Sequence, residues 1–340
     1  MTTIRAILSI AVVNNWYLNQ LDVITTFLLG DLKENVYMKV PPGLIVPHSN
    51  LVCKLEKSLY GLKQAGSGMP SLLMFSYNQK LLNVEFSIKD LSELKIFLGM
   101  EIARSDKGIL LYQIKYTLDL LEETCMLAYK PYSTPMEYAG RPDISFVVGH
   151  LSQFVPCPTN MHLDGAKRIL RYLKGSISLE VFFSSAESKL KIKVYTDSDW
   201  GGCPYTRRSV LGYCFYLGNA LISWKIKKQQ VVSRSSAEVE YRAMTLATCE
   251  AQWLIYLLQD LHISHSQPVM LYCDNQSALH IAANPVLHER TNHIEIDCHC
   301  VREKVQSGLL HLLSIPTSSQ LADIFIKSLS PGLYNSPFQA

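Results

Sequence analysis

The stretch Ser233–Met244, SRSSAEVEYRAM, constrains the fold most, because it opens a long helix and places a carboxylate on the helix's apolar face. Ser235 and Glu238 have the spacing of a capping box, which predicts that the helix starts there. Glu240 falls on the apolar stripe that follows at helical spacing. A carboxylate facing a core is costly unless a cation or hydrogen-bond donors satisfy it, so Glu240 is a candidate metal ligand. The stripe comprises Ala243, Met244, Ala247, Ala251, Leu254 and Leu258.

The composition is that of a globular protein with room for two domains, at 340 residues, 48% hydrophobic and 18% charged. A formal net charge of +3 argues neither for nor against a nucleic-acid partner. Nine cysteines without paired spacing indicate a reduced intracellular protein, cytoplasmic or nuclear and not secreted. The apolar run Ile4–Val13 is too short to span a membrane, so we expect no membrane partner. The oligomeric state is not predicted.

From residue 189 the pattern is that of one intact α/β unit. Apolar and polar residues alternate from Leu190 to Thr196 and predict a strand that ends at Asp197. Gly218-Asn219 predicts a two-residue hairpin turn. Three antiparallel strands, a helix, a strand, helices and a strand are the element order of a ribonuclease H-like fold with a mixed five-stranded sheet. The other expected elements are strands at Ser209–Leu217, Ala220–Lys227, Pro268–Cys273 and Leu309–Ile315, and helices at Asn275–Ala283, near Glu289–Gln306 and around Asp323.

Four acids lie at the ends of predicted strands or near the starts of predicted helices. Asp197 and Asp274 each close an apolar strand, Glu240 lies in the first turns of a helix, and Asp323 opens the last helix. Carboxyl ends of strands and nearby helix starts line one crevice in an open α/β sheet. Four carboxylates there would repel one another without cations, so we predict a pair of Mg²⁺ or Mn²⁺ ions. Asp199 is the rival of Asp197, because the Asp-Ser-Asp spacing allows either to turn inward; we favour Asp197, which directly follows the strand.

The first half resembles the reverse transcriptase domain of copia-type LTR retrotransposon Pol polyproteins, in the runs Gln20–Lys39 and Val52–Ala65. The resemblance implies that Asp22 is one of three catalytic carboxylates and that Phe27 senses the sugar 2′-hydroxyl. The other two carboxylates of the family form an Asp-Asp pair ahead of the segment seen here as Phe86–Gly99, and this chain contains no Asp-Asp pair. One aspartate cannot hold the two metals of nucleotidyl transfer. We therefore expect an inactive polymerase, with Asp22 as an orphan ligand.

The second half resembles the ribonuclease H domain of the same family, in several separate motifs. The resemblance implies hydrolysis of the RNA strand of an RNA–DNA hybrid, with one metal lowering the pKa of the attacking water and the other stabilising the leaving 3′ oxygen. It implies that Asp197 bridges both ions, that Glu240 and Asp274 share one side, and that Asp323 completes the other. The motifs are YTDSDW at 195–200, TRRSVLG at 206–212, ISWKIKKQ at 222–229, SRSSAEVEYRAM at 233–244, LYCDNQSALHIAANP at 271–285, HERTNHIEIDCHCVRE at 288–303 and QLADIFIKSL at 320–329.

The expected domain organisation follows from these motifs. Residues 1–130 form a truncated α+β reverse transcriptase palm remnant, 131–188 a connection segment, 189–330 the ribonuclease H-like domain and 331–340 a tail. An excision is indicated between Ala65 and Phe86, and a second within 133–146, where only three residues separate STPME from RPDISF.

Two alternatives stay open. The chain as a whole could be a non-catalytic, decayed transposon product with at most weak nucleic-acid binding. The second alternative concerns a zinc site near residue 298, which the sequence disfavours because its candidate ligands lack a clean paired spacing. Those candidates are His288, His293, Cys298, His299 and Cys300. His293 could instead act in product release or proton transfer, or be a structural histidine.

Overall fold

The computed structural model describes residues 1–23, 31–40, 48, 52–57, 88–131, 144–177, 181–186, 190–284 and 295–327. The chain divides into two compact units. One comprises residues 17–94, and the other combines residues 1–16 with residues 95–340. The predicted functional boundaries at 130 and 188 stay a prediction.

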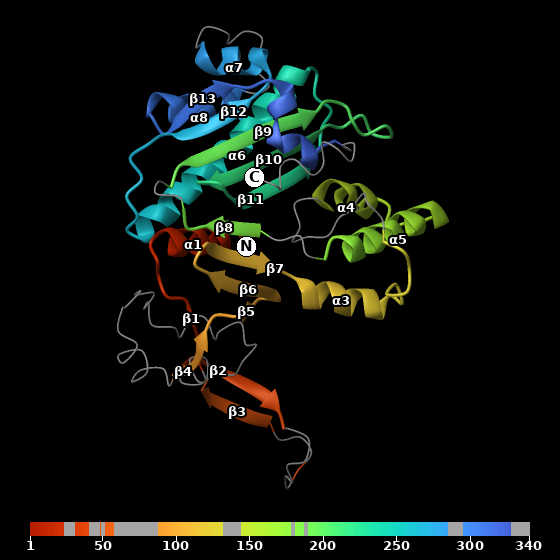
Figure 1. The fold of residues 1–340 in the computed structure, drawn as a ribbon, viewed down its shortest axis with the longest axis vertical. Coiled ribbons are helices and arrows are strands. Elements are labelled where there is room, and N and C mark those ends of the chain that lie inside the picture. Colours follow the sequence, from red (N-terminus) through yellow and green to blue (C-terminus); the bar gives the residue numbers. More distant parts are fainter. Residues whose placement is uncertain are drawn as a thin grey trace. The chain divides into compact units, whose positions relative to one another are not determined.

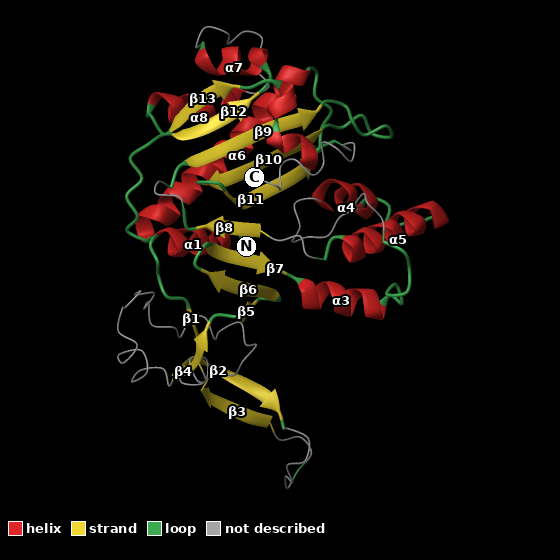
Figure 2. Ribbon diagram, in the orientation of Figure 1, coloured by secondary structure: helices red, strands yellow, loops and turns green. Residues whose placement is uncertain are grey.

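The larger unit contains a mixed five-stranded sheet in the order β11-β10-β9-β12-β13 (Figures 1 and 2). β10 is antiparallel to both β9 and β11, whereas β12 is parallel to both β9 and β13. This arrangement confirms the predicted α/β class and the ribonuclease H-like sheet. The strands are β9 (Ile192–Asp199), β10 (Val210–Leu217), β11 (Ala220–Lys228), β12 (Val269–Cys273) and β13 (Leu310–Ser314).

The long helix α6 (Ser236–Asp260) lies against one face of this sheet and begins where the sequence predicts. The Ser235 hydroxyl accepts a hydrogen bond from the Glu238 backbone N–H at 3.2 Å, and the Glu238 carboxylate accepts one from the Arg234 N–H at 2.8 Å. The predicted apolar stripe is buried throughout. Two further helices, α7 (Gln276–Ala283) and α8 (Glu295–Gln306), contact α6.

The opposite face of the sheet carries the short 3₁₀ turn η5 (Leu321–Phe325). Successive side chains of a strand point to opposite faces. In β10, Leu211 packs with Val239 and Ala243 of α6, and the next residue, Gly212, approaches the η5 side. The sequence predicted a helix around Asp323. Instead, the turn is short and is fixed by side-chain contacts, since the Gln320 amide donates to the Thr196 carbonyl at 2.9 Å.

A second sheet in this unit was not predicted from the sequence. It is antiparallel in the order β5-β6-β7-β8, and the helix α1 (Thr2–Val13) contacts its strands β7 and β8 as well as β11. Strand β7 ends at Tyr112, and a helix begins two residues later, at Ile114. The elements are β5 (Ile96–Phe97), β6 (Met100–Ser105), β7 (Gly108–Tyr112), β8 (Val181–Ser184) and α3 (Ile114–Glu123).

Two helices of the predicted connection segment, α4 (Ser145–Ser152) and α5 (Asn160–Gly175), share a buried cluster with the five-stranded sheet and the η5 segment. Tyr172 and Leu173 of α5 belong to the same cluster as Phe325 and Ile326. The connection helices therefore help to hold the segment that carries Asp323. In the described part of the chain, none of the helices combines the length and apolar character required of a membrane span.

The smaller unit consists of two antiparallel strand pairs. β1 (Asn19–Val23) pairs with β4 (Ile88–Glu93), and β2 (Asp31–Lys39) pairs with β3 (Val52–Lys57). Asp22 lies in β1, opposite Lys89 of β4 in the backbone register. The Asp22 side chain and all of Phe27 lie outside the described part of the chain, so the orphan-ligand assignment stays a prediction.

Candidate metal centre

The four acids singled out in the sequence come from four different elements. Asp197 lies in β9, Glu240 in the second turn of α6, Asp274 directly after β12, and Asp323 in η5. Since β12 is parallel to β9 and pairs with it, both strands deliver their acids to the same end of the sheet. Asp197 and Glu240 are deeply buried, with 2% and 4% of their surface exposed. Such burial requires partners for both carboxyl groups.

Ser198 connects the two buried acids. Its backbone N–H lies 2.8 Å from Asp197 Oδ1 and 3.0 Å from Glu240 Oε1, and its hydroxyl donates to the same Glu240 oxygen at 2.8 Å. Because neighbouring residues of a strand face opposite ways, Ser198 turns toward α6 while Asp197 turns toward η5. The Asp-Ser-Asp motif thus joins groups on both faces of the sheet.

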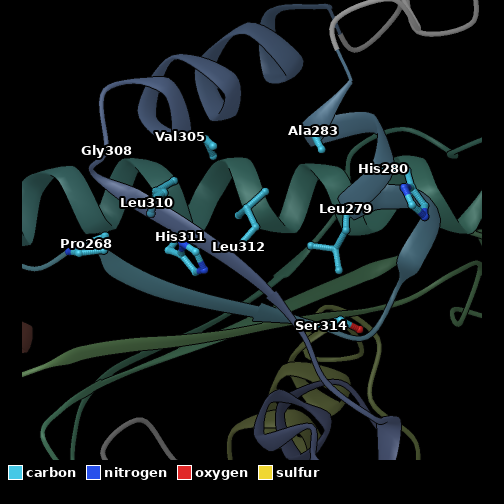
Figure 3. A pocket seen from close by; sticks show the side chains of 10 residues that line it. All are labelled: Pro268, Leu279, His280, Ala283, Val305, Gly308, Leu310, His311, Leu312 and Ser314. Atoms are coloured by element: carbon cyan, nitrogen blue, oxygen red, sulfur yellow. The ribbon is translucent and has the colours of Figure 1, made fainter.

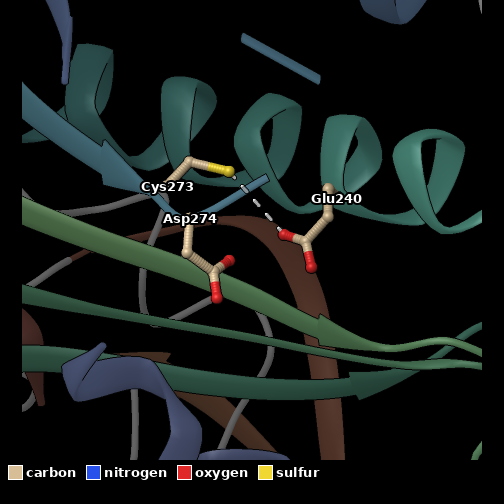
Figure 4. Close-up of side chains that lie close together, drawn as sticks. All are labelled: Glu240, Cys273 and Asp274. Atoms are coloured by element: carbon tan, nitrogen blue, oxygen red, sulfur yellow. Dashed lines mark hydrogen bonds between the residues drawn. The ribbon is translucent and has the colours of Figure 1, made fainter. Parts of the chain in front are cut away.

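Glu240 and Asp274 approach each other at the end of β12, together with Cys273. Their ligand atoms and the Cys273 sulfur all lie within 4.8 Å of one another (Figure 4). The thiol lies 3.9 Å from Glu240 Oε2, and the Thr317 hydroxyl donates to Asp274 Oδ2 at 2.7 Å. Burial raises the pKa of Cys273, which favours the protonated thiol while no metal is bound.

Lys327 joins Asp197 to Asp323. Its Nζ atom lies 2.9 Å from Asp197 Oδ2 and 2.7 Å from Asp323 Oδ1. Lys327 follows Asp323 at the i,i+4 spacing that favours such pairs. Burial lowers the pKa of Lys327, but the hydrogen bonds to both aspartates outweigh burial and leave it above its ordinary value.

A glycine permits the approach of η5 to Asp197. Gly212 of β10 is paired with Asp197 of β9 in the sheet register. A Cβ atom at Gly212 would lie 2.6 Å from Ile326 Cγ2 and 3.2 Å from Phe325 Cβ. The missing side chain therefore leaves room for the segment that brings Asp323 next to Asp197.

The electrostatics of the cluster favour a bound cation. Burial raises the pKa of Asp197, and the neighbouring Asp323 and Glu240 raise it further, whereas the hydrogen bond and the charge of Lys327 lower it. Burial likewise raises the pKa of Glu240, to about 7, with a contribution from the charge of Asp274. Ionised forms of these groups are costly without a counter-charge. An oxygen donor set of this kind suits Mg²⁺ or Mn²⁺, so the residues present fit such ions.

Asp199, the rival of Asp197, lies at the end of β9 and is partly exposed. Its carboxylate packs against Gly202, where a Cβ atom would lie 1.7 Å from Asp199 Oδ2. Burial raises the pKa of Asp199, while the charge of Lys327 lowers it. Asp197 contacts Ser198 and Lys327 and interacts with Glu240 and Asp323. The choice of Asp197 over Asp199 as the bridging ligand stays a prediction.

All four predicted acids thus form one connected cluster, although their roles as catalytic ligands stay a prediction. Sequence reasoning missed Ser198, Cys273, Thr317 and Lys327. The i,i+4 spacing of Asp323 and Lys327 was a usable signal for one of them. Of the zinc candidates, His288 and His293 lie outside the described residues, while Cys298 is 2% exposed.

A separate pocket of about 540 Å³ lies between α7, α8 and β13 (Figure 3). Its lining is mostly apolar and includes His280 and His311, but none of the four acids. We therefore assign it no part in the carboxylate chemistry.

Comparison with known proteins identifies the family. Residues 1–74 match a family model described as reverse transcriptase (RNA-dependent DNA polymerase). Over 97% of its length, the chain is 38% identical to the retrovirus-related Pol polyprotein from transposon RE1 of Arabidopsis thaliana. It is 36% identical over the same share to the polyprotein from transposon RE2. The chain belongs to the Pol polyproteins of copia-type transposons.

This Pol polyprotein chain spans 28% of the length of RE1 and of RE2. The alignment with RE1 extends over 404 positions, more than the 340 residues of the chain, so RE1 has residues that this chain lacks. Among solved structures, the match to the N-terminal RNase H domain of rv2228c from Mycobacterium tuberculosis covers 44% of this chain and 98% of the matched chain, with 11% identity and a TM-score of 0.30. The assignment of the fold rests on the strand order β11-β10-β9-β12-β13 and its mixed directions.

Proposed function

We propose that this Pol polyprotein fragment hydrolyses the RNA strand of RNA–DNA hybrids at the four-carboxylate cluster. The observation that carries the proposal is the meeting of Asp197 and Glu240, both almost fully buried, with Asp274 and Asp323 at one end of the sheet. Burying carboxyl groups side by side opposes folding, which favours a site that holds cations. All four acids would hold Mg²⁺ or Mn²⁺.

When bound, divalent ions would supply charge stabilisation at phosphorus and an activated water. The protein's own part is to fix the oxygens that receive the ions. Ser198 holds Glu240 through two donors, at 3.0 and 2.8 Å, and Thr317 holds Asp274 at 2.7 Å. Preorganised oxygens of this kind need little rearrangement during the reaction.

The surroundings of the cluster suit a nucleic-acid substrate. Arg207 and Arg208 are exposed in the connection that leaves the Asp199 end of β9. Lys228 closes β11 at the same end of the sheet, where it is paired with Val210 of β10 and its ammonium group donates to Gln153 Oε1 and Cys203 Sγ. Arginine and lysine at such positions contact phosphates, whereas the 2′-hydroxyl distinguishes RNA from DNA.

The polymerase half is proposed to be inactive. Two-metal nucleotidyl transfer requires several carboxylates, and the sequence offers Asp22 without the Asp-Asp pair of the family. Primer extension on an RNA template is therefore expected to fail with the full chain. Extension by this chain would contradict the proposal for the first half.

The test of the nuclease is cleavage of an end-labelled RNA–DNA hybrid by the full chain with Mg²⁺ or Mn²⁺. Asp197→Asn is expected to abolish cleavage, whereas Asp260→Asn, an exposed position at the end of α6, keeps it. Circular dichroism establishes that each variant is folded. A folded wild-type chain that leaves the hybrid intact would favour the second candidate, a non-catalytic transposon product with at most weak nucleic-acid binding.

A further inference from the structure

The ammonium group of Lys327 lies between the carboxylates of Asp197 and Asp323, where a bound metal ion would also have to lie. This group lies within hydrogen-bond distance of Asp197 Oδ2 and Asp323 Oδ1 at the same time. These oxygens belong to the acids expected to hold one of the two ions. An ammonium group and a divalent ion on the same pair of oxygens would repel each other strongly in a partly buried site.

The two halves of the cluster differ in this respect. Glu240 and Asp274 meet beside Cys273, whereas Asp197 and Asp323 meet at a cation supplied by the chain itself. The Glu240–Asp274 half therefore carries a charge that a divalent ion can neutralise. The Asp197–Asp323 half has much of its charge neutralised already.

Lys327 is held firmly, yet it has a path to solvent. Its side chain is 38% exposed, compared with 3% for Asp197 and 17% for Asp323. A lysine stem is flexible and its head group is strongly hydrated, so the ammonium can leave for water without disturbing the core. The two aspartates, in contrast, are fixed by β9 and η5.

We propose that Lys327 is an internal cation that fills the Asp197–Asp323 half of the cluster and competes with a divalent ion for it. The proposal rests on the cation site of the proposed function. Lys327 stabilises the acidic cluster before metal arrives, and its displacement makes the second ion bind more weakly than the first.

The test is titration of the metal-free full chain with Mn²⁺, followed by the electron paramagnetic resonance signal of free Mn²⁺. Lys327→Met is expected to bind the weaker ion at least about tenfold more tightly than wild type, about 1.4 kcal/mol. Lys304→Met is the matched control, because Lys304 is a lysine paired with Glu303 at 2.9 Å on α8. It removes the same charge and is expected to bind Mn²⁺ as wild type does.

Thermal unfolding provides an independent readout. Without metal, Lys327→Met is expected to melt at a lower temperature than wild type, since the carboxyl groups lose their counter-charge; saturating Mn²⁺ is expected to raise its Tm by more than that of wild type. If Lys327→Met does not fold without metal, Lys327→Gln, which keeps hydrogen-bond donors but not the charge, takes its place.

The proposed competition would be rejected if Lys327→Met and wild type bound Mn²⁺ equally tightly. It would also be rejected if Lys304→Met gained as much Mn²⁺ affinity as Lys327→Met. Hybrid cleavage is measured separately and tests the proposed function. Tighter Mn²⁺ binding without cleavage would support the role of Lys327 and reject the nuclease. Hybrid cleavage by wild type, with no gain in Mn²⁺ affinity in Lys327→Met, would support the nuclease and reject the role of Lys327.

Discussion

Substituting Gly212 by alanine tests whether the approach of η5 to the sheet builds the cluster. The added Cβ atom would lie 2.6 Å from Ile326 Cγ2, about 1 Å closer than the optimal separation of two carbon atoms. Ile326 is fully buried, at 0% exposure, so a shift of its methyl group would press on other core atoms. Overpacking of this kind costs about 1–3 kcal/mol. Reduced freedom of the unfolded chain returns about 0.4–1 kcal/mol, so we expect a net loss of stability.

The loss is measured as the free energy of unfolding in urea, followed by circular dichroism. Gly212→Ala is also expected to weaken Mn²⁺ binding, because the displaced segment carries Asp323 away from Asp197. Ile326→Ala alone costs about 2–5 kcal/mol through the cavity it leaves. In the double variant the added methyl group fills part of that cavity, so the loss is smaller than the sum of the two single losses.

Unchanged or increased stability of Gly212→Ala would refute the close packing of η5 on β10. Additive losses in the double variant would refute the contact between residues 212 and 326. A destabilised Gly212→Ala variant with unchanged Mn²⁺ affinity would show that the packing of η5 does not build the ion site.

Further predictions concern the buried acid and the N-terminal helix. Burial raises the pKa of Glu240 to about 7, so the metal-free folded state binds more protons than the unfolded state between that pH and the ordinary value of 4.5. Its free energy of unfolding therefore falls as the pH rises through this window. Glu240→Gln is expected to reduce that slope in urea unfolding at pH 5 and pH 8; a variant with the slope of wild type would contradict the assignment. Leu8→Ala in α1, where Leu8 is 1% exposed, is expected to lower the free energy of unfolding by about 2–5 kcal/mol. Leu91→Ala, at a position that is 41% exposed, is expected to change it by less than about 0.5 kcal/mol; equal effects would show that α1 is not packed as described.

Local patterns predicted the elements around the cluster. The anomaly of Glu240 on an apolar helix face identified a residue that is indeed buried, at 4% exposure. Alternation of apolar residues predicted β9, and Gly218-Asn219 predicted the turn between β10 and β11. These features depend on residues close together in the chain, so the sequence carries them directly.

Several other features formed by distant residues were not predicted. The pairing of β7 with β8 joins Gly108 to Ser184, and no local pattern specifies such a partner. The same holds for the packing of α1 on β11 and for the contact of Lys327 with Asp197, which brings together residues far apart in sequence. The sequence predicted a helix around Asp323, where the structure has a 3₁₀ turn. The prediction failed because the shape of this segment depends on tertiary contacts such as that of Gln320 with Thr196.

The proposed nuclease depends on side chains from β9, α6, the end of β12 and η5 holding divalent ions together. Anomalous diffraction at the manganese absorption edge, from crystals of the full chain grown with Mn²⁺, locates such ions without reference to activity. We predict an anomalous peak among the carboxylates of Asp197, Glu240 and Asp274. Peaks only elsewhere on the protein, with these three carboxyl groups in contact with protein donors alone, would contradict the proposal.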